Sequence, residues 1–479
     1  MKVVFITPEL APVAKVGGLA DVAASLPRAL SRLGHELVVI TPLYGSIDAA
    51  RYRLRSTGVS VGVPMNGATR RGEIFRARLN GVTTYFVDNE DYFSGRQVYG
   101  ENGTDYDDNA FRFAYFTRAA LQATRQLELA PDIYHLHDWQ SALLPIYQRL
   151  DPSGDVRVPT LLTVHNLAYQ GLAPSDWLER LGLPRRLFDI DGLEFYGQIN
   201  VLKGGLLAAD RITTVSPTYA REIQTRDYGA GLEGVVGSRS DKLTGILNGI
   251  ELADWHPGKD RALSAHFSST RLAGKLRGKA ALQQELGLEP DARVPLVAAI
   301  GRLDRQKGFD VLLEAAPTLI GSSGTQLVVL GSGNDAMLEA FARLQERFPR
   351  SVSVNRGFQD ALGRRIYAGA DLFLMPSRYE PCGLGQMIAL RYGTLPVVRA
   401  TGGLADSITD LDAEPTRGNG FTFDDCNAAA LVRAVRRALR HYEDAATWTR
   451  WVRRAMREDF SWKRSASAYV SIYEKTITP

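Results

Sequence analysis

The sequence predicts an α/β fold built from two doubly wound, Rossmann-like domains, and if their sheets face each other they enclose a deep cleft. Short apolar runs typical of buried strands alternate with helical patterns in both halves of the chain. Each half also opens with a strand, a glycine-containing turn and a helix. At 479 residues the chain is too long for one ordinary core. Two domains of about 200–250 residues therefore explain the alternation better than one very large sheet.

The first half starts with an apolar strand at 2–7, followed by a helix at 19–33 whose apolar residues recur every three or four positions. The short alternating runs within 51–90 predict an antiparallel, β-rich insertion. Residues 91–107 have the composition of a loop. The remaining elements expected here are strands at 36–42, 132–138, 161–166, 211–216 and 242–248, and a helix at 108–127.

The polar, turn-rich stretch 251–260 is the best candidate for a linker, because the strand and helix alternation restarts after it. A loop at 301–308 precedes a helix at 309–320, and residues 428–458 are helical. Ser461 then caps a last amphipathic helix. The strands expected in this half are 294–300, 325–330, 351–354, 371–375, 395–398 and 420–423. The expected domains are residues 1–247 and 248–457, with a terminal helix, 458–479, that packs back on the first.

Composition excludes several classes of function. The chain is 45% hydrophobic and 23% charged, its net charge is only +4, and no block of five like charges predicts a nucleic-acid partner. The sequence enters a strand directly at its start, without a signal peptide, and no apolar run approaches the roughly 20 residues of a membrane helix. The two cysteines form no disulfide framework. These features predict a cytoplasmic protein that binds neither nucleic acid nor a membrane.

Ligands of open α/β sheets bind beyond the carboxyl ends of the strands. If two such sheets face each other, the polar residues at these ends line one cleft. They are Lys15, Asp138, His165, Asn166, Asn248, Arg302, Lys307 and Glu380.

The stretch 378–393 carries the most informative pattern. It follows the strand at 371–375, places Glu380 at a turn, and continues into a helical pattern that starts near Leu384. Free N–H groups and the positive end of a helix dipole favour an anionic group such as a phosphate. A carboxylate beside such an end favours a ligand that is polyhydroxylated on one side and anionic on the other, as a nucleotide-sugar is.

Two further segments have both a functional and a structural interpretation. Arg302 and Lys307 could clamp a diphosphate from their loop, or be solvated surface charges; the strand-end position and the flanking glycines favour the clamp. The Lys-Val-Gly-Gly-Leu segment from Lys15 offers backbone N–H groups and one ammonium to an anion, or is only the tight turn of a βαβ unit.

Other motifs are assigned structural roles. The fingerprint from Gly331 lacks the acidic partner that a dinucleotide-binding site needs, so a dehydrogenase is rejected. The histidines at 135, 137 and 165 match no metal-ligand spacing, and hydrogen-bonded strand-end histidines are expected. Cys382 has no base paired with it in sequence, which favours packing over a nucleophilic role. The aromatic residues of the 91–107 loop are expected to tether it.

Taken together, the motifs resemble those of bacterial glycogen synthases and plant starch synthases over essentially the whole chain. The matching segments are Pro8-Glu9, KVGGLAD at 15–21, HDW at 137–139, TVHN at 163–166, KGG at 203–205, NGI at 248–250, GR at 301–302, QKG at 306–308, PS at 376–377, EPCGL at 380–384 and TGGLAD at 401–406. The resemblance implies a GT-B enzyme that transfers glucose from ADP-glucose to the non-reducing 4-OH of an α-1,4-glucan such as glycogen. It implies retention of configuration, no metal and no cofactor, with an N-terminal acceptor domain and a C-terminal donor domain.

The resemblance also implies roles for individual residues. Glu380, His165, Arg302, Lys307 and Asp138 are the implied catalytic group. Glu380 anchors glucose hydroxyls, Arg302 and Lys307 approach the donor phosphates, and His165 lies against the glucose. The implied substrate-binding positions are Lys15, Gly17, Gly18, Asp21, Asn166, Asn248, Cys382, Gly383, Leu384 and Gly385.

The sequence departs from the family pattern at three positions. Val16 and Gly385 each stand where the family usually has threonine, and Ile388 replaces the second acidic residue found in related transferases. At Gly385 the change removes a phosphate contact and weakens the start of the helix. The alternatives left open are a related transferase that uses UDP-glucose or a small acceptor, and a catalytically weak glucan-binding protein.

Overall fold

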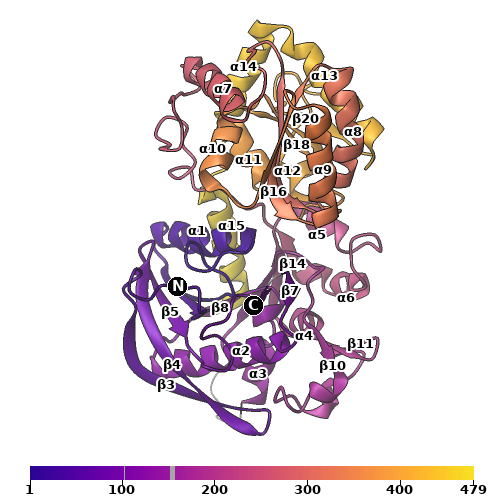
Figure 1. Ribbon diagram of the computed structural model, residues 1–479. Coiled ribbons are helices and arrows are strands. Elements are labelled where there is room, and N and C mark those ends of the chain that lie inside the picture. The colour runs from indigo at the N-terminus through magenta and orange to yellow at the C-terminus, as the bar shows by residue number, and fades with distance from the viewer. Residues whose placement is uncertain (102, 152–156, 479) are drawn as a thin grey trace. The chain divides into compact units, whose positions relative to one another are not determined.

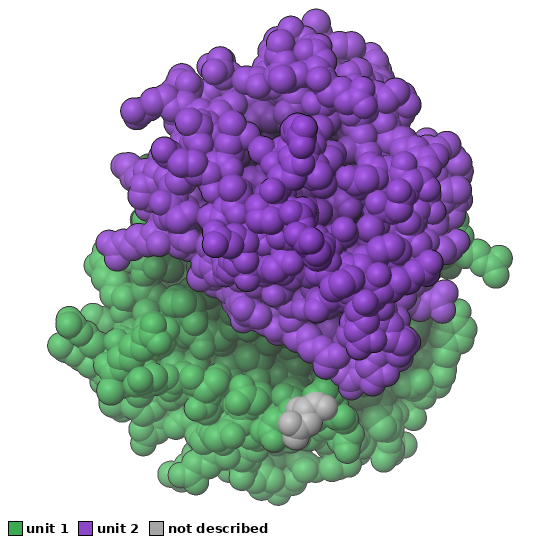
Figure 2. Space-filling view, turned by 45° about the horizontal axis from the view of Figure 1, so that its top comes forward, with its two compact units in different colours: residues 1–249, 462–479 green, residues 250–461 purple. Residues whose placement is uncertain are grey.

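The computed structural model describes residues 1–101, 103–151 and 157–478, and Figure 1 traces them as a ribbon. The chain forms two compact units, coloured separately in Figure 2. Unit 1 comprises Met1–Gly249 and Trp462–Pro479, and unit 2 comprises Ile250–Ser461. The sequence predicts the corresponding divisions after residues 247 and 457. Pro479, the last residue of the predicted terminal helix, lies outside the described residues.

Unit 1 is built on a nine-stranded sheet with the order β14-β13-β9-β8-β1-β2-β5-β4-β3. Its strands are β1 (Lys2–Ile6), β2 (Glu36–Pro42), β3 (Arg55–Met65), β4 (Ala68–Leu79), β5 (Val82–Val87), β8 (Ile133–His137), β9 (Thr160–Val164), β13 (Arg211–Thr214) and β14 (Leu243–Gly245). The strands from β14 to β5 are parallel, whereas β4 pairs antiparallel with both β3 and β5. The predicted antiparallel insertion is therefore confirmed, and it extends the parallel sheet.

Helices and two small sheets complete unit 1. The helices are α1 (Gly18–Arg32), α2 (Asn109–Gln126), α3 (Leu144–Leu150), α4 (Val201–Ala208), α5 (Pro217–Glu222), α6 (Glu233–Ser238) and α15 (Trp462–Ile477). The small sheets are formed by β6 (Gly100–Glu101) with β7 (Thr104–Asp105), and by β10 (Leu172–Pro174), β11 (Glu194–Phe195) and β12 (Gln198–Asn200). In α1 the apolar stripe that predicts the helix, including Leu19, Val22 and Leu26, is buried.

The terminal helix α15 packs within unit 1. Its apolar stripe, with Trp462, Ala466 and Tyr469, is buried. The Tyr473 hydroxyl lies 2.8 Å from Nδ1 of His135 on β8. Burial of this stripe and a side-chain hydrogen bond to a core strand explain why the last helix joins the first unit although it follows the second in sequence.

Unit 2 contains a six-stranded parallel sheet with the order β17-β16-β15-β18-β19-β20. Counted along the chain, this is the order 3-2-1-4-5-6 of a doubly wound fold, which reverses direction between β15 and β18. The strands are β15 (Leu296–Leu303), β16 (Gln326–Gly333), β17 (Val352–Arg356), β18 (Leu372–Met375), β19 (Leu395–Arg399) and β20 (Phe421–Phe423).

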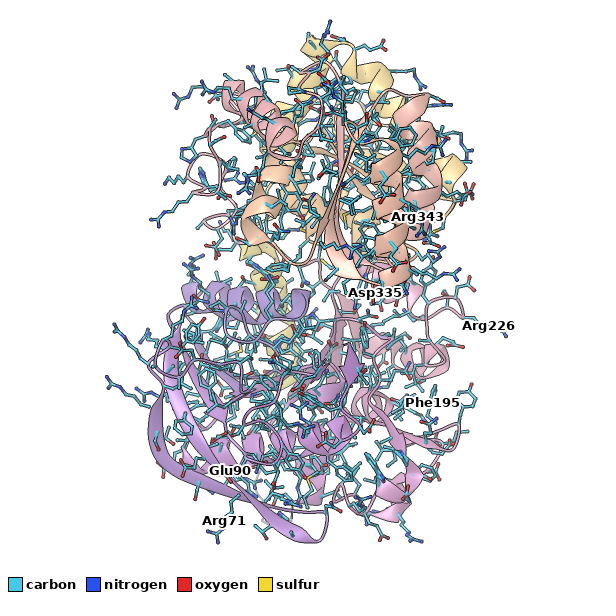
Figure 3. All side chains as sticks on the ribbon, viewed as in Figure 1. Arg71, Glu90, Phe195, Arg226, Asp335 and Arg343 are labelled. Carbon is cyan, nitrogen blue, oxygen red and sulfur yellow. The ribbon has the colours of Figure 1, made fainter. Side chains whose placement is uncertain are left out.

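Helices lie on both faces of this sheet, with α8 and α9 on one side and α7 and α10 on the other (Figure 1). They are α7 (Ala273–Glu285), α8 (Phe309–Gly321), α9 (Asp335–Arg347), α10 (Asp360–Gly369), α11 (Gly385–Arg391), α12 (Gly402–Ser407), α13 (Ala428–Tyr442) and α14 (Ala445–Ala455). In α9, Asp335 and Arg343 are exposed (Figure 3), whereas Leu338 and Phe341 are buried. This alternation is the amphipathic pattern that a helix covering a sheet requires.

Two predictions for unit 2 are wrong in detail. Residues 251–260 are not a free linker: Trp255 stacks under the Arg364 guanidinium at 4.2 Å, and buried Asp260 accepts hydrogen bonds from Arg364 and Tyr392. The predicted loop at 301–308 is shorter, because β15 continues to Leu303. Partners from distant parts of the chain order the first segment, and pairing with β16 extends the second.

No helix among the described residues is long and apolar enough to cross a membrane.

Candidate active site

The predicted site residues lie in two groups, one in each unit, and each group includes residues that follow the strands where the strand order reverses. In unit 1, His165 and Asn166 follow β9 instead, and Asn248 follows the edge strand β14. In unit 1 the reversal falls between β1 and β8, and in unit 2 between β15 and β18. At such a point the loops that leave neighbouring strands turn to opposite faces, which opens a crevice at the carboxyl ends.

In unit 1, Glu9 organises the loop that follows β1. Its carboxylate is buried, and Oε2 accepts hydrogen bonds from the backbone N–H groups of Val16 (2.9 Å) and Gly17 (2.8 Å). Oε1 accepts a hydrogen bond from the Tyr99 hydroxyl at 2.8 Å. The expectation that these two N–H groups are available to a phosphate is therefore wrong, because a protein carboxylate already occupies them. Glu9 is absent from the predicted site residues, although an acid directly after the first strand was a signal for it.

Lys15 and Asp21, both predicted to bind substrate, form an ion pair with 2.8 Å between Nζ and Oδ1. Their side chains are 39% and 37% exposed. An exposed pair of this kind contributes about 1 kcal/mol or less. The ion pair with Asp21 therefore holds the Lys15 ammonium only weakly. Gly17 and Gly18 stand at the N-terminus of α1, Gly17 as the residue before the first turn.

Asp138 has an unusual backbone and an unusual carboxyl group. It follows β8 with φ of 54°, a conformation that costs a non-glycine residue of order 1–3 kcal/mol. Its Oδ1 accepts a hydrogen bond of 2.6 Å from the backbone N–H of His165. Burial raises the pKa of this carboxyl to about 7, and the N–H groups of His165 and Asn166 oppose that rise. Strain and a shifted pKa at a strand end are features found at functional sites.

Three histidine rings lie beside Asp138. His135 and His137 are completely buried, and burial holds the pKa of both well below the usual value. Burial also lowers the pKa of His165 to about 3. All three rings are therefore neutral near pH 7. No group of three His, Cys, Asp or Glu residues that could hold a metal ion occurs within the described parts of the chain.

The two asparagines predicted to bind substrate differ in their surroundings. Asn166 is half-buried, and its Oδ1 accepts from the N–H of Ala168 at 3.1 Å. Asn248 is buried, and its Oδ1 has no hydrogen-bond partner among the described residues.

In unit 2, Glu380 is held by two side chains through a single oxygen. Lys307 Nζ lies 2.6 Å from Oε2, and Ser377 Oγ lies 3.2 Å from the same atom. Oε1 makes no hydrogen bond with any described residue. Glu380 is 4% exposed, so this arrangement is a fixed acceptor within a largely buried site. Lys307 comes from the loop after β15 and Glu380 from the loop after β18, the two strands that flank the reversal.

A glycine allows these two loops to approach closely. Gly308 has φ of 70°, and a Cβ placed on it would lie 1.9 Å from the Pro376 carbonyl oxygen. Any side chain at this position would separate the Lys307 loop from the Glu380 loop. Arg302, by contrast, is half exposed at the end of β15, where it lies 3.4 Å from Asp304 and 3.1 Å from Gln306.

Hydrogen bonds from the Gln386 side chain to backbone carbonyl groups hold the segment between Glu380 and α11. The Gln386 amide donates to the carbonyl groups of Cys382 (3.1 Å) and Gly383 (3.0 Å), and Gly383 has φ of 71°. Cys382 is buried. Leu384 precedes the helix without a side-chain cap.

Gly385 is fixed by packing. A Cβ at this position would lie 3.0 Å from the Phe373 ring and 3.3 Å from the Tyr367 hydroxyl. The absence of a side chain at 385 is therefore matched by aromatic rings that fill the space, which local sequence could not reveal.

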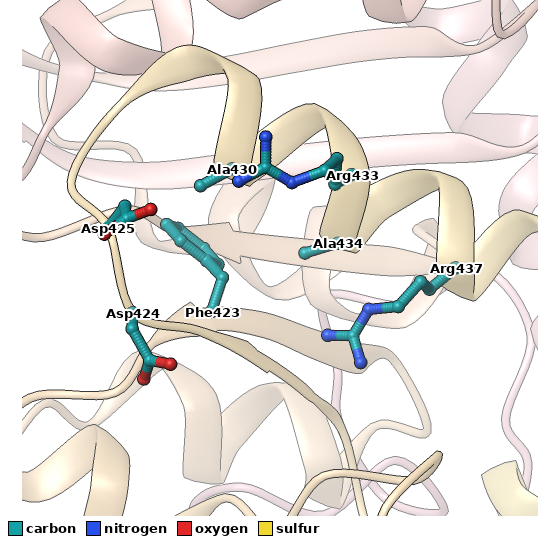
Figure 4. A pocket seen from close by; sticks show the side chains of 7 residues that line it. All are labelled: Phe423, Asp424, Asp425, Ala430, Arg433, Ala434 and Arg437. Atoms are coloured by element: carbon teal, nitrogen blue, oxygen red, sulfur yellow. The ribbon is translucent and has the colours of Figure 1, made fainter.

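A separate cavity of about 270 Å³ lies between β20 and α13 (Figure 4). It is lined by Phe423, Asp424, Asp425, Ala430, Arg433, Ala434 and Arg437. None of the predicted site residues lines this cavity.

Comparison with known proteins identifies the family. Residues 2–238 match the family described as starch synthase catalytic domain, and residues 285–454 match glycosyl transferases group 1. A glycogen synthase 2 of Geobacter sulfurreducens is 46% identical over 476 residues, which cover 99% of this chain and 98% of the relative. A glycogen synthase of Anaeromyxobacter sp. is 47% identical over 485 residues, covering all of both chains.

Solved structures agree with these matches. The catalytic domain of starch synthase IV from Arabidopsis thaliana, bound to ADP and acarbose, has a TM-score of 0.93 and 38% identity, and the match covers 100% of this chain and 99% of that one. A sucrose-phosphate synthase from Thermosynechococcus elongatus shares the fold, with a TM-score of 0.62 at 18% identity over 100% of this chain and 99% of that one. Full-length identity of this order, together with two family matches in sequence, shows that the chain belongs to the glycogen and starch synthase family of glycosyltransferases.

Proposed function

We propose that this chain elongates an α-1,4-glucan such as glycogen by transferring glucose from ADP-glucose to the non-reducing 4-OH with retention of configuration. The observation that carries the proposal is the geometry of Glu380. Its Oε2 is used by Lys307 and Ser377, while its Oε1 remains open among the described residues. A fixed carboxylate oxygen with no protein donor is suited to accept hydrogen bonds from sugar hydroxyls.

The charges beside Glu380 suit a nucleotide leaving group. An ammonium group carries three hydrogens, and Lys307 gives one of them to Glu380. The remaining two can reach a donor phosphate, and Arg302 adds a partly exposed guanidinium at the end of the neighbouring strand. Lys307 thus links the sugar anchor to the phosphate site.

These groups act where charge develops. As the bond between glucose C1 and the phosphate oxygen breaks, negative charge collects on the departing ADP and positive charge on the sugar. Fixed cations stabilise that separation more in the transition state than in the ground state, and each is worth roughly 2–4 kcal/mol. Cys382, Gly383, Leu384 and Gly385 contribute backbone groups around the sugar and phosphates.

Retention needs no protein nucleophile in this proposal. The acceptor 4-oxygen bonds to C1 on the face that the phosphate leaves, and its proton passes to the departing phosphate oxygen. Glu380 is tied through Oε2 to a cation, which favours an anchoring role over nucleophilic attack. No metal or cofactor enters the step.

Unit 1 supplies the acceptor side of the reaction. We assign sugar contacts to His165, Asp138, Asn166 and Asn248, and donor-phosphate contacts to Lys15 and the backbone of Gly18. Gly17 shapes this turn, and Asp21 orients the Lys15 ammonium through their ion pair. The two free thiols of the chain fit a reducing compartment such as the cytoplasm.

The test is incubation with radiolabelled ADP-glucose or UDP-glucose and a series of acceptors. Label in ethanol-precipitable glucan from ADP-glucose and long maltodextrins supports the proposal. Preference for UDP-glucose, or for a small aglycone, supports the related transferase instead. Retardation in a glycogen gel without any transfer indicates a glucan-binding protein and refutes the proposal.

A further inference from the structure

Three histidine rings of unit 1 lie in a row beside the carboxyl ends of β8 and β9, with His135 and His137 stacked and His165 tilted against the edge of His137. The ring centroids of His135 and His137 are 4.3 Å apart, and those of His137 and His165 are 5.3 Å apart. Phe5 continues the stack, with its centroid 5.3 Å from that of His137. The two inner histidines are completely buried, while His165 is half-buried and stands at the edge of the site.

His135 and His137 differ in the number of ring nitrogens that make hydrogen bonds. His135 uses both ring nitrogens, with Nδ1 2.8 Å from the Tyr473 hydroxyl and Nε2 2.6 Å from Oγ1 of Thr163. His137 uses one: its Nδ1 lies 3.0 Å from Nε2 of His165. Nε2 of His137 is buried without any partner among the described residues.

One proton therefore lies between His137 and His165, because both rings are neutral at this depth. If His165 carried that proton on Nε2, neutral His137 would hold its own proton on Nε2, where a buried N–H would have no acceptor. If His137 carries the shared proton on Nδ1, its Nε2 is only a bare lone pair. Orphaned buried N–H groups are rarer than unfilled acceptors, so the second arrangement is favoured.

We propose that His137 is a positioning residue that fixes the tautomer of His165 by donating Nδ1–H to its Nε2, so that His165 carries its proton on Nδ1. The tautomer of a histidine is set by the hydrogen bond of its other nitrogen. Nδ1 of His165 makes no hydrogen bond with any described residue and is not among the fully buried polar atoms. His165 therefore presents a hydrogen-bond donor to the substrate, and it has no free lone pair for a proton because Nδ1 is protonated and Nε2 accepts from His137.

The chemical consequence rests on the proposed function. A donor at this point selects an acceptor oxygen on the sugar and excludes His165 as a general base. The backbone of His165 is fixed in addition by its N–H bond to Asp138. The backbone position and the ring proton of His165 are thus determined by two different neighbours, Asp138 and His137.

Nuclear magnetic resonance tests the inference on the ligand-free, full-length protein. In ¹⁵N-histidine-labelled protein, long-range ¹H–¹⁵N correlation distinguishes a protonated ring nitrogen from a bare one, and His165→Ala assigns the signals by their loss. The inference predicts a protonated Nδ1 and a bare Nε2 for His165. A protonated Nε2 on His165 would overturn it. Because no substrate is present, this result does not depend on the proposed function.

Two variants separate the hydrogen bond from the ring stack. His137→Phe keeps an aromatic ring between His135 and His165 but removes the donor, whereas His137→Asn removes the ring but retains an N–H donor near the position of Nδ1. We expect His137→Phe to lose the single-tautomer signature and to lower kcat/KM about tenfold, with His137→Asn closer to the parent in both. If both variants lose kcat/KM equally, or if only His137→Asn loses it, His137 has a packing role instead. If neither variant folds, the spectrum of the parent protein still shows which ring nitrogen of His165 carries the proton.

Discussion

Replacing Glu380 by glutamine tests the sugar anchor without removing its shape. Lys307 and Ser377 both donate to Oε2, so the glutamine carbonyl must take that position to keep both hydrogen bonds. The amide NH2 group then replaces Oε1. The one open acceptor becomes a donor, and a sugar hydroxyl that donated to it loses its partner.

The expected loss follows from this exchange. A hydrogen bond to a charged group is worth roughly 1.5–3 kcal/mol, which corresponds to a decrease in kcat/KM of roughly ten- to 150-fold. Thermal stability should change little, because both protein hydrogen bonds survive and the Lys307 side chain is 25% exposed, so water can solvate its charge. The assay is initial-rate glucan labelling at varied ADP-glucose, beside thermal unfolding.

Glu285→Gln provides the matched control. It breaks the bidentate ion pair between Glu285 on α7 and Arg365 on α10, at 2.7 and 2.8 Å and away from the strand ends. We expect parental kcat/KM in this variant. Parental kcat/KM in Glu380→Gln, with normal unfolding, would refute the anchoring role.

Three other changes probe the site. The Asp138 carboxyl has a native pKa of about 7, above its unfolded value of about 3.9, so the parent loses stability as the pH rises from 5 to 8. Asp138→Asn lacks this titration and should become progressively more stable than the parent over that range. A difference in melting temperature that does not change with pH would contradict this. Gly385→Thr should lower the free energy of unfolding by about 1–3 kcal/mol, because its Cβ would press on Phe373, and it should not restore affinity for the donor. A lower KM for ADP-glucose at an unchanged melting temperature would contradict this expectation. Glu9→Ala leaves two N–H groups and the Tyr99 hydroxyl unpaired, and should lower stability by about 2–3 kcal/mol, read by chemical unfolding; parental stability would show that water replaces the carboxylate.

The strand and helix pattern could be predicted well from sequence because it depends on local periodicity. Every strand predicted in the second half is present, with its ends shifted by a few residues. The order of those strands could not be predicted from periodicity, and it is the order that brings Lys307 beside Glu380, 73 residues away. Sequence reasoning named both residues yet treated them as separate contacts.

The remaining errors share a physical cause: contacts with residues distant in sequence decide the structure at these positions. Glu9 was missed because its hydroxyl partner, Tyr99, lies 90 residues away. The stretch 251–260 has the composition of a linker, but Arg364 and Tyr392 order it. At Gly385 the predicted loss of a hydroxyl stays a prediction, and the structure adds that Phe373 packs closely where a Cβ would lie.

The central claim is that this chain transfers glucose from ADP-glucose to glucan through a site anchored by Glu380. The most direct measurement compares the parent and Glu380→Ala in incorporation of ADP-[¹⁴C]glucose into precipitable glycogen, with glycogen binding measured in parallel. The claim predicts strong labelling by the parent, loss of at least roughly tenfold in the variant, and equal glycogen binding by both. Glycogen binding without labelling by the parent, or equal labelling by both proteins, would contradict it.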